Sequence, residues 1–327
     1  MRNLTTWVDA QITAVKNLTP TVREIQIAAP DLGASAPGAH VNIQVLINGR
    51  PDHRSYSVVR PLDSGGVVIA VKRVPDSRGG SAYMWGLEAG ARVKITPPAC
   101  DFELSLGAPD YLLVAGGIGI TPIIRMAEVL VARGHRLRMI YATRSREELA
   151  YLEPLKELLG AALIICVADE GVFLNATEEI GKLEQNGELY ICGPLGLMDV
   201  VRKAWTEHGR NQANIHYETF GSSGRHPAQE FTVRVPRLGV EVVVPKDRSM
   251  LDVLNEVGVE VLSDCRRGEC GLCALDINAV AGEIDHRDVF FSEEQHAESK
   301  RMCACVSRVA GGCVTIDPAW RGDPVLR

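Results

Sequence analysis

The sequence has few aromatic side chains and no block of basic residues. Aromatic residues make up 5% of its 327 positions, and 41 Asp and Glu outnumber 35 Lys and Arg, for a net charge of −6. Nucleic-acid binding needs a clustered positive surface, and single strands also need aromatic side chains on which bases stack. The composition therefore argues against nucleic acid as a partner.

Long hydrophobic runs are also missing. No stretch approaches the ~18 consecutive apolar residues of a membrane span, and residues 1–7 lack the apolar core of a signal peptide. We therefore expect a cytoplasmic protein with no membrane span. The eight histidines show no spacing typical of metal ligands. We interpret Asp285-His286-Arg287-Asp288 as a loop with capping contacts and surface ion pairs, and assign it no chemistry.

Cysteine, by contrast, is plentiful and unevenly placed. Five of the nine cysteines lie between residues 265 and 305. A secreted disulfide scaffold usually has an even number of cysteines, so this distribution favours a reduced protein with a metal site. The other four cysteines, Cys100, Cys166, Cys192 and Cys313, are expected to be buried as small apolar side chains.

Cys265, Cys270 and Cys273 have the spacing C-x4-C-x2-C of plant-type [2Fe–2S] proteins, in which one distant thiolate completes the ligand set. Glycines between these ligands allow the backbone to wrap the cluster. A zinc-stabilised interaction module is the alternative, but structural zinc sites favour two short cysteine pairs. Spacing leaves both Cys303 and Cys305 open as the fourth ligand, because positions two apart in a strand face the same way.

Short alternating strands separated by Gly and Pro turns occupy residues 8–105, a pattern typical of a small antiparallel barrel. One helix is expected near Gly80–Gly86. The expected strands are Val8–Lys16, Arg23–Ala28, His40–Ile47, Arg54–Arg60, Gly66–Arg73 and Ala91–Thr96.

From residue 111 onward, strands alternate with helices, which indicates a parallel sheet covered by helices on both faces. The expected strands are Tyr111–Ala115, Leu137–Tyr141, Leu163–Val167 and Leu189–Cys192. The expected helices are Thr121–Arg133, Glu147–Leu159, Thr177–Leu183 and Leu195–His208.

The breaker-rich segment Gly221–Pro227 is the best linker candidate. Beyond it we expect a hairpin, a short helix and a closing strand, at Phe231–Val235 with Val240–Val244, Met250–Val257 and Cys313–Ile316. The sequence is accordingly divided into residues 1–105, residues 106–222, a linker at 223–229 and a last domain at 230–327.

Two glycine-containing segments of the middle domain suggest nucleotide binding. The run Gly116-Gly117-Ile118-Gly119-Ile120-Thr121-Pro122 follows a strand and opens a helix, where glycines let the backbone approach a pyrophosphate. We expect Thr121 to cap this helix, with Pro122 at its first position. Cys192-Gly193-Pro194 ends another strand; taken alone it is an ordinary strand terminus, and the functional alternative places Cys192 beside a nicotinamide.

Two segments of the first domain suggest a flavin. In Arg54-Ser55-Tyr56-Ser57, arginine offers a fork for phosphate, tyrosine an aromatic face and serine a hydroxyl. Arg78-Gly79-Gly80-Ser81 is a second anion-compatible turn. In isolation the first segment is better explained as a solvent-facing strand with one packed tyrosine, but two phosphate-compatible elements in one barrel favour a cofactor.

Together, and in this order, these motifs resemble the phthalate dioxygenase reductase family. The resemblance spans nearly the whole sequence. It implies a multidomain fold with an antiparallel β-barrel flavin domain, an α/β parallel-sheet nucleotide domain like that of ferredoxin-NADP reductase, and an α+β β-grasp ferredoxin domain. It implies flavin binding by Arg54, Ser55, Tyr56, Ser57, Arg78, Gly79, Gly80 and Ser81, and nucleotide binding by Gly116, Gly117, Gly119, Thr121, Cys192 and Gly193.

The resemblance also selects residues that spacing leaves open. The family places its last cluster ligand in a C-V-S-R-like string, which Cys305–Arg308 matches, so Cys305 is implied as the fourth ligand. It ends the reductase module with an aromatic residue stacked on the flavin, which implies Phe220. Ser57 is implied to hydrogen-bond flavin N5, and Cys192 to lie beside the nicotinamide during hydride transfer.

The function implied by the resemblance is electron transfer from NADH through FMN and a [2Fe–2S] cluster to a separate terminal oxygenase, with FMN favoured over FAD. The favoured acceptor is a Rieske non-haem iron oxygenase or demethylase acting on an aromatic or other small compound. The alternatives are a cytochrome P450 acceptor and, less favoured because ~100 residues follow the linker, an electron-transfer subunit of the dihydroorotate dehydrogenase type.

The coenzyme stays open between NADH and NADPH. Arg144-Ser145-Arg146 follows the second strand of the nucleotide domain, where Arg144 is a candidate to receive a 2′-phosphate. We expect a monomer.

Overall fold

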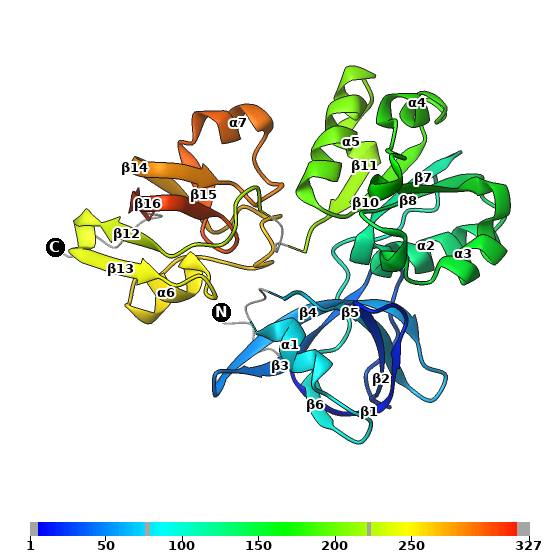
Figure 1. Ribbon diagram of the computed structural model, residues 1–327, viewed down its shortest axis with the longest axis horizontal. Helices are drawn as coiled ribbons and strands as arrows, with labels where there is room; N and C mark the ends of the chain where they lie inside the picture. Colours follow the sequence, from blue (N-terminus) through cyan, green and yellow to red (C-terminus); the bar gives the residue numbers. More distant parts are fainter. Residues whose placement is uncertain (1–5, 76–78, 221–223, 319–327) are drawn as a thin grey trace. The chain divides into compact units, whose positions relative to one another are not determined.

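The computed structural model describes residues 6–75, 79–220 and 224–318. Its backbone divides into two units, Met1–Glu218 and Thr219–Arg327 (Figure 1). The first unit contains a closed barrel and a parallel sheet, and the second contains one mixed sheet. Because the barrel and the parallel sheet share one unit, the expected boundary at residues 105–106 stays a prediction. Ser223 of the expected linker lies outside the described residues.

The barrel confirms the expected antiparallel flavin-domain fold. Its strands run in the order β1-β2-β5-β4-β3-β6. In β3, Val41, Ile43 and Val45 are at most 1% exposed and alternate with less buried polar residues, as a strand with one face in the core requires. The elements are β1 (Val8–Asn17), β2 (Val22–Ala28), β3 (His40–Ile47), β4 (Arg50–Pro61), β5 (Gly66–Lys72), α1 (Gly80–Trp85) and β6 (Arg92–Ile95).

The parallel sheet has the strand order β11-β10-β7-β8-β9. Its central strand β7 is buried at every position, as a strand covered on both faces should be. Figure 1 shows α2 and α3 on one face of this sheet and α4 and α5 on the other. The elements are β7 (Tyr111–Gly116), α2 (Ile120–Ala132), β8 (Leu137–Thr143), α3 (Leu152–Leu159), β9 (Leu163–Val167), α4 (Ala176–Gly181), β10 (Glu188–Cys192), α5 (Leu195–Glu207) and β11 (Ile215–Glu218).

Two sequence predictions for this sheet need correction. The helix expected over Glu147–Leu159 is wrong in its first part, because a short 3₁₀ turn at Arg146–Glu148 precedes α3. Tyr151, with φ of 59°, interrupts the helical backbone between them. The edge strand β11 was not predicted.

The second unit is a β-grasp fold with the strand order β13-β12-β16-β14-β15, in which β12 and β16 run parallel. The predicted hairpin, short helix and closing strand are confirmed. The long strand β14, β15 and α7 were not predicted. The elements are β12 (Phe231–Val235), β13 (Val240–Val244), α6 (Met250–Glu256), β14 (Ala274–Asp285), α7 (Glu293–Glu298), β15 (Arg301–Cys303) and β16 (Arg308–Asp317).

Among the described residues, no helix combines the length and the apolar character needed to cross a membrane. Of the four scattered cysteines, Cys166 and Cys192 are buried as expected. Cys100 and Cys313 are only half-buried, which corrects the prediction for these two.

Candidate cofactor sites

The predicted flavin motif lies on β4, where Arg54 is anchored by its own strand. Its Nη1 donates to the Asp52 carboxylate at 2.6 Å and to the His53 carbonyl at 2.7 Å. Burial raises the pKa of Asp52, but the Arg54 guanidinium lowers it by more. The pKa of Asp52 therefore lies below its ordinary value. Both contacts use Nη1, so Nε and Nη2 remain the donors with which Arg54 would bind a phosphate.

The next three residues of β4 alternate between the two faces of the strand. Ser55 is exposed, and its hydroxyl donates to Asn42 Oδ1 at 2.5 Å. Tyr56 packs against the barrel core, and burial raises the pKa of its phenol. Ser57 is only 4% exposed and pairs with His40 on β3. The strand thus carries a hydroxyl, an aromatic ring and a second hydroxyl that are increasingly buried from Ser55 to Ser57.

The second predicted flavin element lies directly beside the first. A Cβ atom added to Gly80 would stand 2.7 Å from both Cγ and Nε of Arg54, so the absence of a side chain at Gly80 lets Arg54 lie against the turn. Gly79 has φ of 90°, a conformation that also favours glycine. The Ser81 hydroxyl accepts from the backbone N–H of Val74 at 3.4 Å. Arg78 lies outside the described residues. The structure therefore brings Arg54 and the Gly79–Ser81 turn together, a fit for a flavin phosphate.

The glycine turn after β7 has two different physical roles. A Cβ atom on Gly119 would lie 2.1 Å from the Cys192 carbonyl oxygen, and one on Gly116 would lie 3.0 Å from the Gly193 Cα. These glycines therefore allow the ends of β7 and β10 to pack closely. Gly117, with φ of 55°, faces open space, with no atom within 4 Å of an added Cβ. Gly117 therefore leaves the backbone of this turn open, and its predicted role in nucleotide binding stays a prediction.

Thr121 does not cap α2, which corrects the sequence prediction. The helix begins one residue earlier, at Ile120, with Gly119 as its N-cap and no side-chain cap. The Thr121 hydroxyl instead donates to the Ile118 carbonyl at 3.0 Å. Pro122 is accordingly the third helical residue and not the first.

The carboxyl ends of β7 and β10 meet where a parallel sheet binds its ligands. Cys192 is fully buried and pairs with Ala115 of β7 and Glu218 of β11. Gly193 follows it and lies against Gly116. The open turn at Gly117 therefore lies next to the segment that ends β10, at the sheet edge where nucleotides bind in such folds.

Arg144 and Arg146 at the end of β8 differ in their contacts. Arg144 is exposed, and its backbone carbonyl accepts from Asp169 at 2.9 Å. Arg146 forms a two-pronged contact with Glu170, at 2.6 Å through each pair of atoms. The charge of Arg146 is thereby balanced within the protein.

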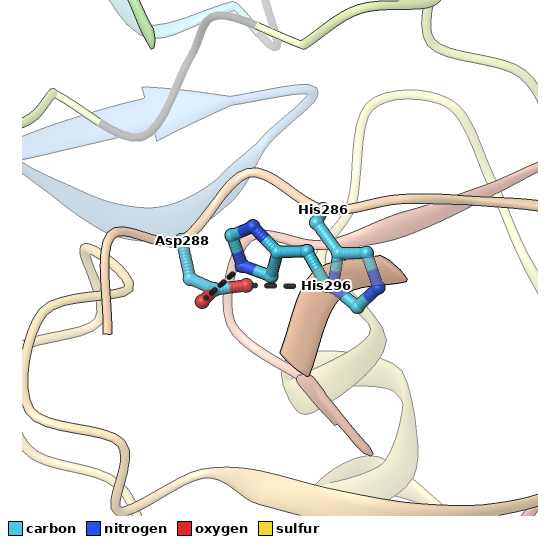
Figure 2. Close-up of side chains that lie close together, drawn as sticks. All are labelled: His286, Asp288 and His296. Atoms are coloured by element: carbon cyan, nitrogen blue, oxygen red, sulfur yellow. Dashed lines mark hydrogen bonds and ion pairs between the residues drawn. The ribbon is translucent and has the colours of Figure 1, made fainter. Parts of the chain in front are cut away.

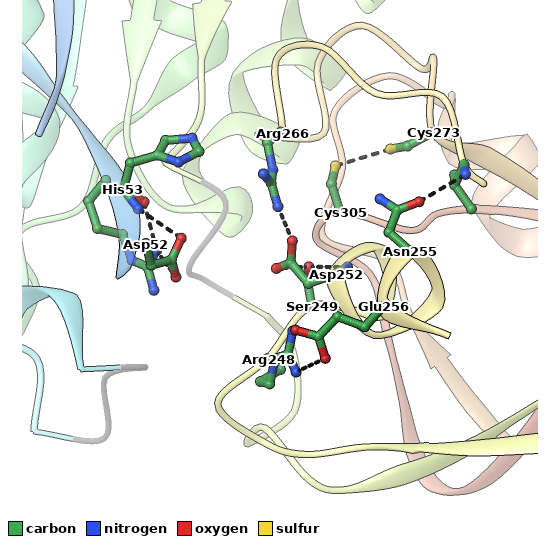
Figure 3. A network of polar contacts seen from close by, with 12 residues as sticks. Asp52, His53, Arg248, Ser249, Asp252, Asn255, Glu256, Arg266, Cys273 and Cys305 are labelled. Atoms are coloured by element: carbon green, nitrogen blue, oxygen red, sulfur yellow. Dashed lines mark hydrogen bonds and ion pairs between the residues drawn. The ribbon is translucent and has the colours of Figure 1, made fainter. Parts of the chain in front are cut away.

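The predicted cluster cysteines converge in the second unit. The thiols of Cys273 and Cys305 lie 3.2 Å apart although 32 positions separate them in sequence (Figure 3). The backbone N–H groups of Arg267, Glu269 and Cys270 each point at Cys265 Sγ from 3.4 Å. Sulfur atoms that accept several backbone N–H groups are typical of iron–sulfur ligands, whose charge these contacts stabilise.

Cys303 also lies close to these thiols, so both candidates for the fourth ligand lie beside Cys273. Hydrogen bonds with Cys303 and then Cys305 lower the pKa of Cys273, despite its burial. Cys303 ends β15 and is completely buried. The neighbouring Cys273, burial, and the nearby Asp288 and Cys305 raise the pKa of its thiol. Cys305 instead has Cys273 and Cys265 as neighbours and accepts from the Gly268 N–H. These contacts favour Cys305.

Two glycines in the loop are required by its geometry. Gly268 has φ of 79°, and a Cβ atom there would lie 2.7 Å from the Val306 side chain and 2.9 Å from the Asp288 Cα. Gly271 has φ of 70°, and its Cβ would stand 2.3 Å from the Phe290 ring. The loop is also tied to α6 by an ion pair between Arg266 and Asp252 (Figure 3). The donor set and the tightly packed glycines fit a [2Fe–2S] cluster.

The residues before the linker are held by the cluster loop. The backbone N–H of Thr219 donates to Glu269 Oε1 at 2.9 Å, and Glu269 precedes the ligand Cys270. Phe220, the predicted flavin-stacking residue, is half-buried and belongs to the second unit. Its role stays a prediction.

The expected capping contact and ion pair of Asp285–Asp288 are present, since Asp288 accepts from the Phe291 N–H and Arg287 pairs with Asp285, but the expected surface location is wrong. The four residues of this segment are 2%, 9%, 7% and 2% exposed. Arg287 pairs with Asp285 at 2.6 Å and also donates to the His226 carbonyl at 2.8 Å. The segment follows β14 into the core of the second unit, which the sequence pattern gave no means to foresee.

Comparisons with known proteins agree with this arrangement. Residues 233–310 match the family model described as a 2Fe-2S iron-sulfur cluster binding domain. The chain is 33% identical to the heme-dependent oxidative N-demethylase beta subunit of Ectopseudomonas mendocina (strain ymp), over 96% of this chain and 100% of that protein.

Two solved structures extend the similarity to the fold. Phthalate dioxygenase reductase, described as a modular structure for electron transfer from pyridine nucleotides to [2Fe-2S], is 30% identical with a TM-score of 0.72, over 95% of this chain and 98% of that one. An intact type IV self-sufficient cytochrome P450 monooxygenase is 28% identical with a TM-score of 0.65, over 95% of this chain and 41% of that one.

The same function is indicated by the order of the three folds, by the cysteine loop and by these relatives. The chain is an oxidoreductase that uses a flavin, a [2Fe–2S] cluster and NAD(H), and it delivers electrons to a terminal oxygenase. It belongs to the phthalate dioxygenase reductase family of oxygenase reductases.

Proposed function

We propose that this reductase takes electrons from NADH, carries FMN as its flavin, and supplies a separate Rieske non-haem iron oxygenase. The observation that carries the proposal is the convergence of Cys273 and Cys305 beside Cys265, in a chain that also has a flavin motif and a nucleotide turn. When bound, the flavin converts a two-electron hydride donor into one-electron steps, and the cluster carries those electrons singly.

Arg54 and the Gly79–Ser81 turn would hold the flavin phosphate. Among the described residues, Arg54 lies directly beside the Gly79–Ser81 turn, an arrangement that fits the single phosphate of FMN. Tyr56 would cover a flavin face, and the shielded Ser57 hydroxyl would hydrogen-bond its edge. Phe220 would stack on the flavin from the reductase module's last residues.

The open backbone at Gly117, together with Thr121, would receive the pyrophosphate, with Cys192 and Gly193 near the nicotinamide. Glu170 balances the charge of Arg146, which makes Arg146 a poor receptor for the 2′-phosphate of NADPH and supports NADH. Arg144 remains the residue that would contact the adenosine ribose, and NADPH would need this side chain for its 2′-phosphate. Comparing kcat/KM for NADH and NADPH tests this choice, and a higher value for NADPH would contradict it.

The acceptor is tested by reconstitution. The purified holoprotein, which we expect to be monomeric, is mixed with a panel of Rieske oxygenases and cytochromes P450, and NADH-dependent product formation from aromatic and small N- or O-methyl substrates is measured. We expect turnover with Rieske oxygenases. Turnover with P450s alone would overturn the Rieske assignment while leaving the reductase chemistry intact.

The P450 alternative rests on one specific observation. Nearly the same fold occupies 41% of a self-sufficient P450 monooxygenase, in which reductase and haem share a chain. This similarity supports a haem acceptor as the alternative. The panel therefore includes both acceptor classes at equal concentration and ionic strength, because encounter rates between charged proteins depend on salt.

A further inference from the structure

Three side chains of the second unit meet in a buried cluster that the electron-transfer function does not use. His286 and Asp288 follow β14, and His296 comes from α7 (Figure 2). Their candidate ligand atoms all lie within 4.8 Å of one another. The Asp288 side chain is completely buried, and those of His286 and His296 are 8% and 16% exposed.

Asp288 is an ionised carboxylate at the centre of the cluster. Its Oδ2 lies 3.0 Å from His296 Nε2 and accepts from the Phe291 N–H at 3.1 Å. Its Oδ1 accepts from the Ser307 hydroxyl at 3.1 Å. Burial raises the pKa of Asp288, but His286, His296 and the Phe291 N–H together lower it well below its ordinary value.

Of the two ring nitrogens of His286, Nε2 forms a hydrogen bond and Nδ1 forms none with the described residues. The Ser299 hydroxyl donates its proton to the His296 carbonyl at 2.9 Å, so Ser299 Oγ must accept from His286 Nε2 at 3.2 Å. His286 Nε2 therefore carries a proton. Among the described residues, the buried Nδ1 has no hydrogen-bond partner and faces Asp288 Oδ1 from 3.8 Å.

A neutral His286 would thus point a lone pair at a buried carboxylate oxygen, an unfavourable pairing of two acceptors. A proton on Nδ1 would turn this contact into an ion pair, but 3.8 Å is too long for a hydrogen bond. A metal ion between the groups would bind both Nδ1 and the carboxylate directly. Ligands of a tetrahedral Zn²⁺, bound at about 2.0–2.1 Å, stand roughly 3.3 Å apart. The separations of 3.0 Å and 3.8 Å bracket this value.

We propose that His286, Asp288 and His296 form a binding site for a divalent metal ion of the Zn²⁺ type, separate from the [2Fe–2S] cluster. Two imidazoles and one carboxylate are ligands that suit Zn²⁺. The contact of His286 Nε2 with Ser299 is the outer hydrogen bond that commonly fixes the tautomer of a metal-bound histidine.

The site adjoins the back of the cluster loop. Asp288 binds Ser307, two residues after Cys305, and the Val289 N–H donates to the Gly268 carbonyl at 3.0 Å. A metal ion that fixes Asp288 therefore also fixes both segments that surround the cysteines. We expect bound Zn²⁺ to slow the loss of the cluster, measured as bleaching of its visible absorbance in air.

Equilibrium dialysis of the holoprotein against buffered Zn²⁺, followed by elemental analysis, tests the site. The wild type should bind one Zn²⁺ per chain with no loss of iron. His296→Gln should weaken Zn²⁺ binding at least tenfold and abolish its effect on bleaching. His226→Gln is the matched control, because His226 belongs to the same unit but is 35% exposed and pairs with Glu283.

The proposal is overturned if the wild type takes up no Zn²⁺, if His296→Gln binds it equally well, or if each Zn²⁺ displaces iron from the cysteines. Should His296→Gln lose its cluster on purification, His286→Asn decides by the same measurement. Loss of Zn²⁺ binding in that variant with iron retained supports the site, and unchanged binding overturns it.

Discussion

At the scale of single residues, the identity of the fourth cluster ligand is the sharpest question. Cys303 and Cys305 both neighbour Cys273, but Cys305 also neighbours Cys265, whereas Cys303 is buried beside Asp288. We expect Cys305→Ser to lose most of its iron while NADH still reduces the flavin. Cys303→Ser is the matched control and should keep its iron. Iron analysis and the visible spectrum check both, and iron loss in Cys303→Ser alone would contradict the assignment.

Gly268 offers a second residue-level prediction. Alanine there meets both the left-handed backbone and the overlap with Val306 and Asp288, so we expect a loss of roughly 3 kcal/mol or more and a low iron content. Gly258 has a similar φ of 83° but open surroundings, so Gly258→Ala should cost only ~1–2 kcal/mol and keep its iron. Denaturant unfolding with iron analysis compares them, and equal effects would argue against close packing at Gly268.

The cysteine spacing was readable from sequence because three of the four ligands of a plant-type cluster share one loop. The choice between Cys303 and Cys305 was not, since it depends on how the chain turns after β15. The buried cluster around Asp288 was missed for a similar reason. His286 and His296 come from a strand end and a helix, and only the fold brings them together.

At the scale of elements, two glycines of the turn between β7 and α2 are expected to have different roles, Gly119 in packing and Gly117 in binding. Gly119→Ala should destabilise the protein by several kcal/mol, because its Cβ would overlap the Cys192 carbonyl. Gly117→Ala has room, so it should cost only ~1–2 kcal/mol but raise the Kd for NADH. Thermal unfolding and NADH titration distinguish the two, and an unchanged Kd in Gly117→Ala would contradict the binding role.

Strand β4 gives a prediction with a pH signature. Removing the charge-assisted contact in Arg54→Gln should weaken flavin binding roughly 10–100-fold, the equivalent of ~1.5–3 kcal/mol. In the apoprotein, Asp52 has a folded pKa depressed below 3.8. Its stabilising contribution is therefore present above that pH and is lost as pH falls through the folded value.

The stability difference between wild type and Arg54→Gln should accordingly shrink below pH ~4. Arg92→Gln, on the exposed face of β6, is the control and should leave flavin binding unchanged. Flavin titration and unfolding at several pH values measure both effects. A pH-independent difference would show that Asp52 gains nothing from Arg54.

Most elements were predictable where the hydrophobic pattern was strong, as in the alternation of β3 and the continuous apolar run of β7. The misses have local causes. Tyr151 breaks a helix whose pattern looks continuous. Helix α7 has no apolar stripe, and its only signal in the sequence is the capping box formed by Ser292 and Gln295.

At the scale of the whole molecule, the electron-transfer function follows from the order of the domains along the chain. A flavin barrel, a nucleotide sheet and a cluster domain give one route from a two-electron donor to a one-electron acceptor. None of the individual motifs implies this route. The glycine turn alone is compatible with many nucleotide enzymes, and the cysteine loop alone with any ferredoxin.

The most direct test of this route is anaerobic stopped-flow spectroscopy of the holoprotein mixed with NADH. The account predicts that the flavin absorbance bleaches first and that the [2Fe–2S] bands follow in the same chain at a rate independent of protein concentration. In Cys305→Ser the first phase should remain and the second should vanish. Cluster reduction that does not occur, or that persists without Cys305, would contradict the account.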